Sequence, residues 1–390
     1  MEINILEEAR KNHENVVAWR RALHQIPEIG IQLPETVAFV AGKLAQMGID
    51  YEIYEDCSCV SATIGRGGKC ILLRGDMDAL PVKEESGLSF ASTNGCSHAC
   101  GHDFHAASLL GAAKILKDHE AELPGTVKLI FQSGEEVFQG AAEAIRHGVM
   151  ENPKVDAAFA THVFASMPLN TVCYGEFPMA SVYGFRIRIQ GKGTHGSSPE
   201  TGVDPLVAGA NILLGLQEII AREIPAAEEA VLTIGHFEGG SVANVVPDSA
   251  LLEGTLRTFK KEIKEYIMPR ITQIAESIAC AYRASVAVEE LSNVPAVTTD
   301  TEMMQLMIHA VNELDNGMHL MPALHAMGSE DFAFYSERVP SIIVGMGAGV
   351  EDRSRWVGQH NPRILFHEDI LLNEVALYVK MAIDWLEKNK

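Results

Sequence analysis

The sequence of 390 residues lacks long hydrophobic runs and has few basic residues. It contains no stretch of about 18 or more apolar residues, so we expect no membrane-spanning helix. A basic segment followed by an apolar one is missing at the start, so we expect no secretory signal. Lys and Arg number 31 against 52 Asp and Glu, and the net charge is −21. This charge argues against nucleic acid and membrane surfaces as partners.

Cysteine is also scarce, with seven residues scattered along the chain. An odd, scattered set predicts no disulfide framework, and we expect a reducing, cytoplasmic location. Internal repeats and low-complexity linkers are missing as well. Hydrophobic residues make up 47% and aromatic residues 6%. This profile is typical of a soluble globular protein with a large core, and the length suits two domains.

Short apolar runs rich in β-formers alternate with amphipathic helices over most of the chain. This alternation predicts an α/β fold, with a sheet covered by helices on both faces. Ligand sites in such sheets lie where the strands end. The expected strands are 60–64, 70–73, 127–131, 157–160 and 341–344, and the expected helices include 16–24, 36–47 and 106–117.

A different pattern runs from about residue 181 to 293. It predicts the order βαββαβ, which matches a ferredoxin-like α+β unit. The expected strands are 185–189, 230–236, 250–259 and 285–290, and the expected helices are 205–222 and 260–282. We therefore predict that 182–293 is a second domain inserted into a first domain formed by 1–181 and 294–390.

Asp76 and Asp78 follow the strand 70–73. Two carboxylates at this spacing lie on one side of an extended chain. They could cap a helix in a solvated loop. Alternatively, Asp78 supports a metal-binding histidine from behind.

Cys100 and His102 offer a thiolate and an imidazole two positions apart. Gly101 between them lets both side chains turn toward one point, and both groups bind transition metals. A buried free cysteine beside a core histidine is the alternative interpretation. His98 and His105 compete with this pair, but we expect His105 on the next helix and leave it out of the site.

Glu135 and Glu136 follow the strand 127–131. Adjacent carboxylates can point in opposed directions, so one could bind a metal while the other faces a water molecule. An acidic first turn of a helix is the alternative.

His162 ends another apolar strand, and His360 lies in a loop after a turn expected at 345–349. Each histidine alone could be structural. Together the candidates exceed one tetrahedral metal site. They suit two divalent metals that share a bridging group and a bridging water, as in two-metal hydrolases.

The inserted segment carries His195 on a glycine-bounded turn, together with Asn244 and Arg257. A histidine, an amide and a guanidinium could stabilise an oxyanion and hold a substrate carboxylate. An ordinary surface loop is the alternative.

With these motifs in their order, the chain resembles the M20-type metallopeptidases. Within them it is similar to the amidohydrolase subfamily of N-acyl-amino-acid hydrolases (aminoacylases), hippurate hydrolases and auxin-conjugate hydrolases. The resemblance covers nearly the whole chain. It rests on His24-Gln25-Ile26-Pro27-Glu28, Gly75-Asp76-Met77-Asp78-Ala79-Leu80-Pro81, His98-Ala99-Cys100-Gly101-His102-Asp103, Gly134-Glu135-Glu136, Gly193-Thr194-His195-Gly196 and Gly328-Ser329-Glu330-Asp331-Phe332.

The resemblance implies a zinc-exopeptidase-like catalytic domain and an inserted lid that forms a homodimer. It also implies that Glu135 is the general base and then the acid toward the leaving amine. His195 would polarise the scissile carbonyl from the partner subunit. The metal ligands that it implies are Cys100, His102, Glu136, His162 and His360.

Broader M20 peptidases differ from this chain at three positions. They carry histidine in place of Asp76, a bridging aspartate in place of Cys100, and a carboxylate in place of His162. The amidohydrolase subfamily shares these departures. A thiolate favours zinc, so we expect zinc or manganese, with cobalt or nickel as alternatives.

The expected activity is metal-dependent hydrolysis of the amide in a small N-acyl or N-aroyl amino acid. A dipeptidase or carboxypeptidase of the same fold is one alternative. A binding protein with a purely structural metal is another, and it leaves Glu135 without a task.

Overall fold

The computed structural model describes residues 3–322 and 326–390, which form two compact units. The first unit contains residues 3–178, 298–322 and 331–390. The second contains residues 179–297 and the short segment 326–330, which the sequence pattern did not indicate.

The first unit is built on a mixed sheet of eight strands in the order β1-β2-β4-β3-β5-β14-β6-β13. The four central strands, β4, β3, β5 and β14, run parallel to one another. The strands are β1 (Tyr51–Tyr54), β2 (Cys59–Gly65), β3 (Cys70–Asp76), β4 (Thr126–Gln132), β5 (Ala157–Pro168), β6 (Thr171–Tyr174), β13 (His319–Pro322) and β14 (Ser341–Gly349). The predicted α/β sheet is confirmed, and the carboxyl ends of its parallel strands lie at one edge.

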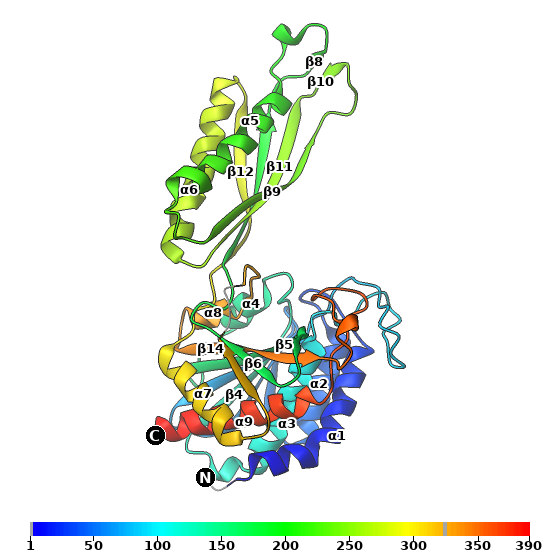
Figure 1. Cartoon of the computed structure of the whole chain (residues 1–390), viewed down its shortest axis with the longest axis vertical. Helices are drawn as coiled ribbons and strands as arrows, with labels where there is room; N and C mark the ends of the chain where they lie inside the picture. Colours follow the sequence, from blue (N-terminus) through cyan, green and yellow to red (C-terminus); the bar gives the residue numbers. More distant parts are fainter. Residues whose placement is uncertain (1–2, 323–325) are drawn as a thin grey trace. The chain divides into compact units, whose positions relative to one another are not determined.

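Helices cover this sheet on both sides, as Figure 1 shows. The helix α3 (His102–Asp118) packs between α1 (Ile5–His24) and α9 (Ile370–Lys388). Its small residues permit the close approach, because a Cβ on Gly111 would lie 2.7 Å from methyl groups of both Val16 and Val375. The other helices are α2 (Pro34–Gln46), α4 (Gly140–Arg146), α7 (Thr301–Leu314) and α8 (Ala333–Ser336).

Two local expectations were wrong in the region of β5 and β14. The segment 345–349 is part of β14 rather than a turn, and β5 continues beyond His162 to Pro168. The glycines of β14 explain both results. A Cβ on Gly345 would lie 2.9 Å from the Phe164 ring, and one on Gly347 would lie 2.0 Å from the Pro168 carbonyl oxygen. Because these glycines have no side chain, β14 can pair with β5 as far as Pro168, with a register shift between Gly347 and Gly349.

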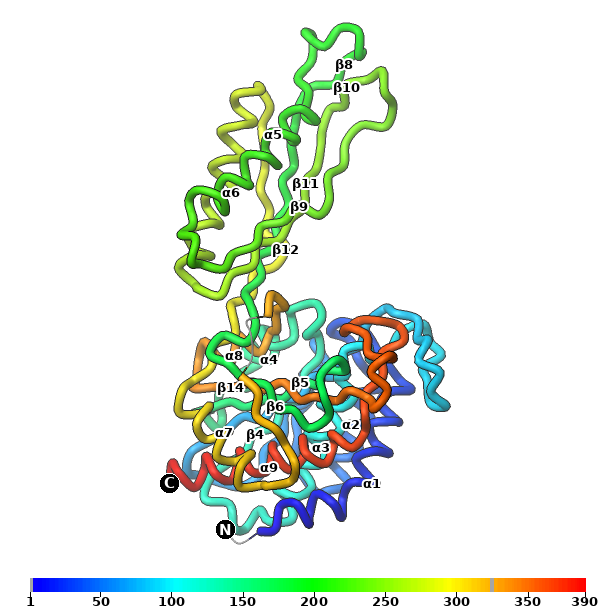
Figure 2. Tube along the Cα trace, in the orientation of Figure 1, coloured from blue at the N-terminus to red at the C-terminus, as the bar shows by residue number. Residues whose placement is uncertain are grey.

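The second unit is an antiparallel sheet in the order β12-β7-β11-β9, with two helices packed on it. The predicted order βαββαβ is confirmed by β7 (Val182–Gln190), α5 (Pro205–Glu218), β9 (Ala230–Gly239), β11 (Ser249–Thr258), α6 (Lys261–Ala281) and β12 (Ser285–Val294). A short pair, β8 (Thr194–His195) and β10 (Val245–Val246), extends it. Figure 2 traces the chain out of the first unit after β6 and back before α7.

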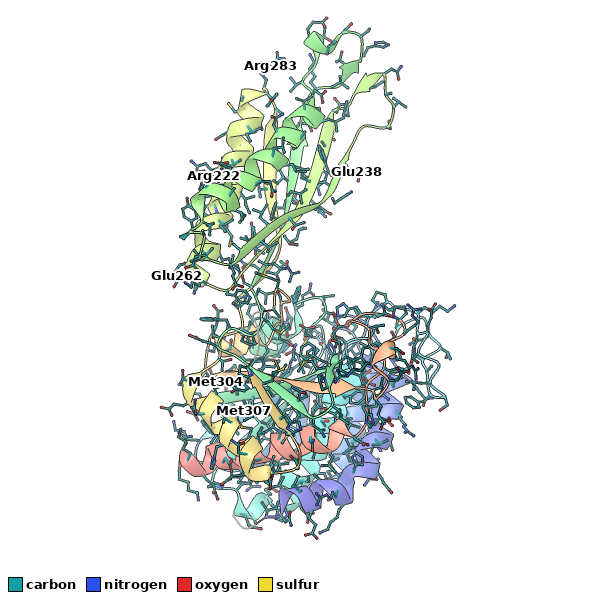
Figure 3. All side chains as sticks on the ribbon, viewed as in Figure 1. Arg222, Glu238, Glu262, Arg283, Met304 and Met307 are labelled. Atoms are coloured by element: carbon teal, nitrogen blue, oxygen red, sulfur yellow. The ribbon has the colours of Figure 1, made fainter. Side chains whose placement is uncertain are left out.

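Buried and exposed residues alternate along β7, and the buried ones pack the sheet of the second unit against its helices. Phe185, Ile187 and Ile189 of β7 are buried against the helices, whereas Arg186 and Arg188 point to the other face. Figure 3 labels further surface charges of this unit, Arg222, Glu238, Glu262 and Arg283. Among the described residues, no helix is both long and apolar enough to cross a membrane.

Candidate metal centre

The carboxyl ends of the parallel strands bring the predicted site residues together. Asp76 ends β3 and pairs in register with Gln132, the last residue of β4. The loop with Glu135 and Glu136 follows directly after β4. His162 lies on β5, in register with a glycine of β14.

The start of α3 contributes the thiol and the first imidazole. Gly101 precedes the helix with a φ of 92°, a left-handed conformation that glycine adopts without strain. A Cβ at this position would lie 2.4 Å from a Val163 methyl group. Around this residue, the ligand atoms of Cys100 and His102 both lie within 4.8 Å of that of His162.

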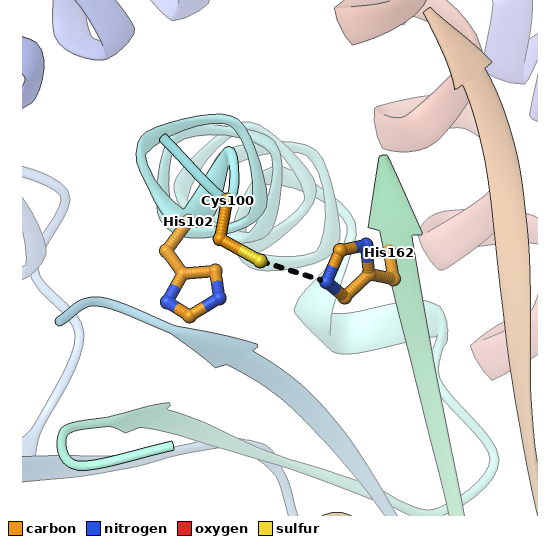
Figure 4. A group of neighbouring side chains, drawn as sticks. All are labelled: Cys100, His102 and His162. Carbon is orange, nitrogen blue, oxygen red and sulfur yellow. Dashed lines mark hydrogen bonds between the residues drawn. The ribbon is translucent and has the colours of Figure 1, made fainter. Parts of the chain in front are cut away.

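Cys100, His102 and His162 form the buried centre of the cluster (Figure 4). The Cys100 Sγ lies 3.5 Å from the His162 Nε2. Potential ligand atoms also approach within 4.8 Å of one another in the set Cys100, Glu136 and His360, and in the set His102, Glu135 and Glu136. Cys100, His102 and Glu136 each belong to two of these three sets.

His360 completes the cluster from a loop. Its backbone has a φ of 67°, and its N–H donates to the Ala99 carbonyl at 2.9 Å. Its Nε2 lies 3.3 Å from the Glu136 Oε1, and its side chain is 50% exposed. The exposed edge of the cluster is therefore at His360.

The polar atoms of His102 fit a metal ion. Its Nδ1 lies 2.9 Å from the Asp78 carbonyl, which can only accept, so Nδ1 carries the proton. Its buried Nε2 has no hydrogen-bond partner among the described residues. Three carboxylates lie 3.6–4.0 Å from this atom, those of Asp76, Glu136 and Glu135. A lone pair surrounded by carboxylates is a suitable position for a divalent cation.

The electrostatics of the site also favour a cation. Burial opposes protonation of His102, but Asp76, Cys100 and Asp78 together outweigh it and raise the pKa of His102 well above its usual range. Burial and the nearby His105 hold the pKa of His162 well below its usual range, which leaves this imidazole neutral. Burial raises the pKa of the Cys100 thiol to about 12. A bound metal must therefore displace the thiol proton.

Asp78 contacts two parts of the cluster. Its carboxylate accepts the backbone N–H groups of Glu135 at 3.1 Å and Glu136 at 3.0 Å. The His102 Nδ1 also lies 3.4 Å from its Oδ1. One carboxylate thus contacts both the histidine and the glutamate loop.

His105 was left out of the predicted site, yet it lies beside it. Its ring centroid is 4.8 Å from that of His162 and 5.4 Å from that of His102. Its Nδ1 lies 2.5 Å from Asp76 Oδ1, and its Nε2 accepts the Val163 N–H at 2.9 Å. The spacing of three residues between His102 and His105 on one helix could have indicated a shared face.

His98, the other competitor, lies next to a second buried network. Its ring centroid is 6.2 Å from that of His24. His24 contacts the carboxylates of Asp103 at 2.8 Å and Glu84 at 3.0 Å. Burial lowers the pKa of His98 to about 4.

The predicted residues of the second unit fall into two places. His195 on β8 pairs with Val245, next to Asn244, and both His195 and Asn244 are exposed. The His195 Nδ1 accepts from the Ser197 N–H at 3.1 Å, so a neutral ring carries its proton on Nε2. Arg257 lies near the other end of β11, which begins just after β10.

The Arg257 guanidinium contacts a different part of the second unit. Its Nη1 donates to the Met327 carbonyl and the Ser329 hydroxyl, both at 3.0 Å. Within one chain, the second unit thus does not bring Arg257 together with His195 and Asn244.

The chain matches known proteins over most of its length. Residues 72–384 match peptidase family M20/M25/M40. The chain is 36% identical to an N-acetylcysteine deacetylase of Bacillus subtilis over 97% of this chain and 98% of that protein. It is 35% identical to the IAA-amino acid hydrolase ILR1-like 4 of Arabidopsis thaliana, over 95% of this chain and 86% of that protein.

A solved structure agrees with these matches. A dinuclear metal-binding peptidase of the M20 family from Bacillus subtilis has a TM-score of 0.82 and 33% identity, covering 97% of this chain and 99% of that one. The chain belongs to the M20 family. It is an M20 amidohydrolase, a hydrolase that acts on amide bonds, in a family with dinuclear metal binding.

Proposed function

We propose that this protein hydrolyses the amide bond of N-acyl or N-aroyl amino acids to a carboxylic acid and a free amino acid. The observation that carries the proposal is Glu135, a buried carboxylate at the edge of a Cys, His and Glu cluster. The relatives support the substrate class, because they include an N-acetylcysteine deacetylase and an IAA-amino acid hydrolase.

In this proposal the ligands would hold two divalent ions at the strand ends, and both ions would share Cys100. Thiolate and imidazole donors suit zinc, and manganese, cobalt and nickel remain candidates. Bound ions of this kind lower the pKa of water and polarise a carbonyl. The proposed ligands are Cys100, His102, Glu136, His162 and His360.

Glu135 moves the proton in this mechanism. Its backbone N–H is held by Asp78, which keeps the carboxylate at the cluster. The carboxylate takes a proton from the attacking water and delivers it to the leaving amine. Asp78 supports this step by fixing both the loop and His102.

The second unit supplies the substrate contacts and forms a homodimer. His195 polarises the scissile carbonyl from the partner subunit, with the proton on its Nε2 as the donor. Asn244, which is exposed beside His195, binds the substrate carboxylate. Arg257 is proposed as a further carboxylate contact, although its place near the other end of β11 separates it from His195 in one chain.

Replacing Glu135 by Gln tests the proposal. The variant should keep its fold and metal and lose several orders of magnitude in kcat, because the amide cannot accept the proton. Glu136→Gln should instead lose metal, and Glu143→Gln, a partly exposed residue of α4 outside the cluster, should match the wild type. Near-wild-type turnover by Glu135→Gln would contradict the assigned role.

The substrate class is tested with zinc- and manganese-loaded enzyme, with metal content measured on the same sample. N-acetyl, N-benzoyl and IAA conjugates of amino acids should be cleaved faster than dipeptides. Preference for dipeptides would replace this proposal with a dipeptidase.

A further inference from the structure

A chain of buried charged and polar groups lies beneath the metal centre, and the proposed mechanism does not use it. Arg74, Asp76, His105 and Asp331 are all fully buried. Burying charges is costly, and well-packed apolar residues often serve stability equally well. These groups therefore call for a role besides stability.

The upper part of this chain is His105, whose two ring nitrogens are both engaged. A backbone N–H can only donate, so the His105 Nε2 must accept the bond from Val163. The proton is then on Nδ1, which donates to the Asp76 carboxylate. No lone pair remains for a metal, so His105 is not itself a ligand.

The Val163 backbone, through its N–H and its carbonyl, connects His105 to His162. The Val163 carbonyl accepts a bond at 2.9 Å from the Nδ1 of His162. This bond places the His162 proton on Nδ1 and leaves Nε2 directed at Cys100. His105 thus holds the N–H of Val163, and the carbonyl of Val163 orients the ring of His162.

The lower part of the chain holds Asp76 itself. Its Oδ2 lies 2.6 Å from the Arg74 Nη1, and the Arg74 Nη2 donates to Asp331 at 2.9 Å. Arg74 Nε also donates to the side chain of Gln132 at 3.2 Å, just before the loop with Glu135. Asp76 is therefore fixed from the side opposite to His105.

We propose that Asp76 and His105 are positioning residues, which orient His162 through the Val163 backbone and so set the geometry of the metal centre. This inference rests on the proposed function, because it assumes that His162 binds metal. In this proposal the pair acts through His162 and not on the substrate itself. Its effect should therefore appear in metal affinity and coordination geometry before it appears in turnover.

The test compares His105→Leu with His105→Gln in the full chain. Leu removes both hydrogen bonds, whereas the amide of Gln can donate to Asp76 and accept from Val163. We expect His105→Leu to fold and to bind zinc about 10–100-fold more weakly in competition with a chelator. The absorption spectrum of its cobalt form should change, since that spectrum reports ligand geometry. His105→Gln should recover much of both properties.

Ser108→Ala is the matched control on the same helix. Ser108 is buried one turn further along α3 and donates to Glu374 at 2.9 Å. This variant also loses a buried hydrogen bond but should keep the zinc affinity and the cobalt spectrum. An equal change in Ser108→Ala would assign the effect to general loosening of α3 and overturn the proposal.

A measurement on the wild-type protein covers the case in which His105→Leu does not fold. Nitrogen-15 NMR of labelled histidines should show His105 as a neutral ring with its proton on Nδ1. A proton on Nε2 would overturn the proposal, as would wild-type zinc affinity in His105→Leu. Neither result depends on any substrate, so failure of the proposed activity would be seen separately, as a wild-type enzyme that cleaves no N-acyl amino acid.

Discussion

His24 shows how a single buried residue can make the stability of this protein depend on pH. Its imidazole lies between the carboxylates of Asp103 and Glu84. Burial opposes its charge, but the two carboxylates outweigh burial and raise the pKa of His24 above its usual value. Several contacts, His24 among them, lower the pKa of Glu84 to about 2 despite its burial. Both carboxylates therefore stay ionised around neutral pH.

The sign of the effect follows from the raised pKa. The charged form of His24 is favoured in the folded protein, so its contribution is complete below the unfolded pKa of about 6.5. It is lost as the pH rises through the higher pKa of the folded state. His24→Gln should lower the free energy of unfolding by about 1.5–3 kcal/mol at about pH 6 and by less at about pH 9.

Urea unfolding of the metal-free proteins at both pH values measures this difference. His309→Gln, which changes an exposed histidine on α7, should have a small effect that is similar at both pH values. A penalty for His24→Gln that grows with pH would contradict the assignment.

At the scale of elements, the metal centre depends on where helices and strands begin and end. The start of α3 is the clearest case. Gly101 lies there between the proposed ligands Cys100 and His102, and its left-handed backbone lets both side chains reach the cluster. Gly101→Ala should cost about 1–2 kcal/mol for the left-handed backbone and about 1–3 kcal/mol more for overpacking against Val163.

Gly95→Ala isolates the backbone contribution. Gly95 has a similar φ of 87°, but its Cβ would meet no atom within 4 Å. Gly95→Ala should lose only the stability that the left-handed backbone costs, about 1–2 kcal/mol, and should keep its metal. Gly101→Ala should lose more stability and also bind less zinc. Urea unfolding and metal analysis would contradict the argument if the two variants behaved alike.

Sequence patterns predicted the elements well where local periodicity determines them. The βαββαβ order and five strands of the eight-stranded sheet, β2, β3, β4, β5 and β14, follow from apolar runs and alternation, whereas the short strands β1, β6 and β13 were not predicted. The end of β5 was predicted too early, because its continuation depends on the partner strand β14. Pairing between distant strands cannot be read from either one alone.

At the scale of the whole molecule, the separation of His195 from Arg257 raises the question of whether His195 acts in its own chain or in the partner subunit of a dimer. Both lie in the second unit, but near opposite ends of β11. If His195 acts on the partner subunit's site, then a dimer needs one intact Glu135 and one intact His195 on different chains. His195→Ala alone should reduce kcat by roughly 10²–10³-fold, as for loss of one oxyanion contact.

Mixing His195→Ala with Glu135→Gln tests this arrangement. Subunit exchange should restore up to about a quarter of wild-type activity, because half the dimers are mixed and each mixed dimer has one complete site. In a control, His195→Ala mixed with the double variant Glu135→Gln/His195→Ala should recover no activity, because neither chain has His195. Absence of recovery in the first mixture, with exchange verified, would show that His195 acts within its own chain.

The sequence alone determined the family and the two kinds of sheet, because these depend on local patterns, and through the family resemblance it predicted the residues of the candidate centre. It indicated Cys100, His102, Glu136, His162 and His360 as donors. Only the tertiary structure revealed that His105 and Asp76 lie beneath them and how Arg257 is placed relative to His195. Hydrogen-bond partners such as Asp76 and His105, or Arg74 and Asp331, come from different elements. Their meeting depends on strand register and helix packing, which no single segment of the chain encodes.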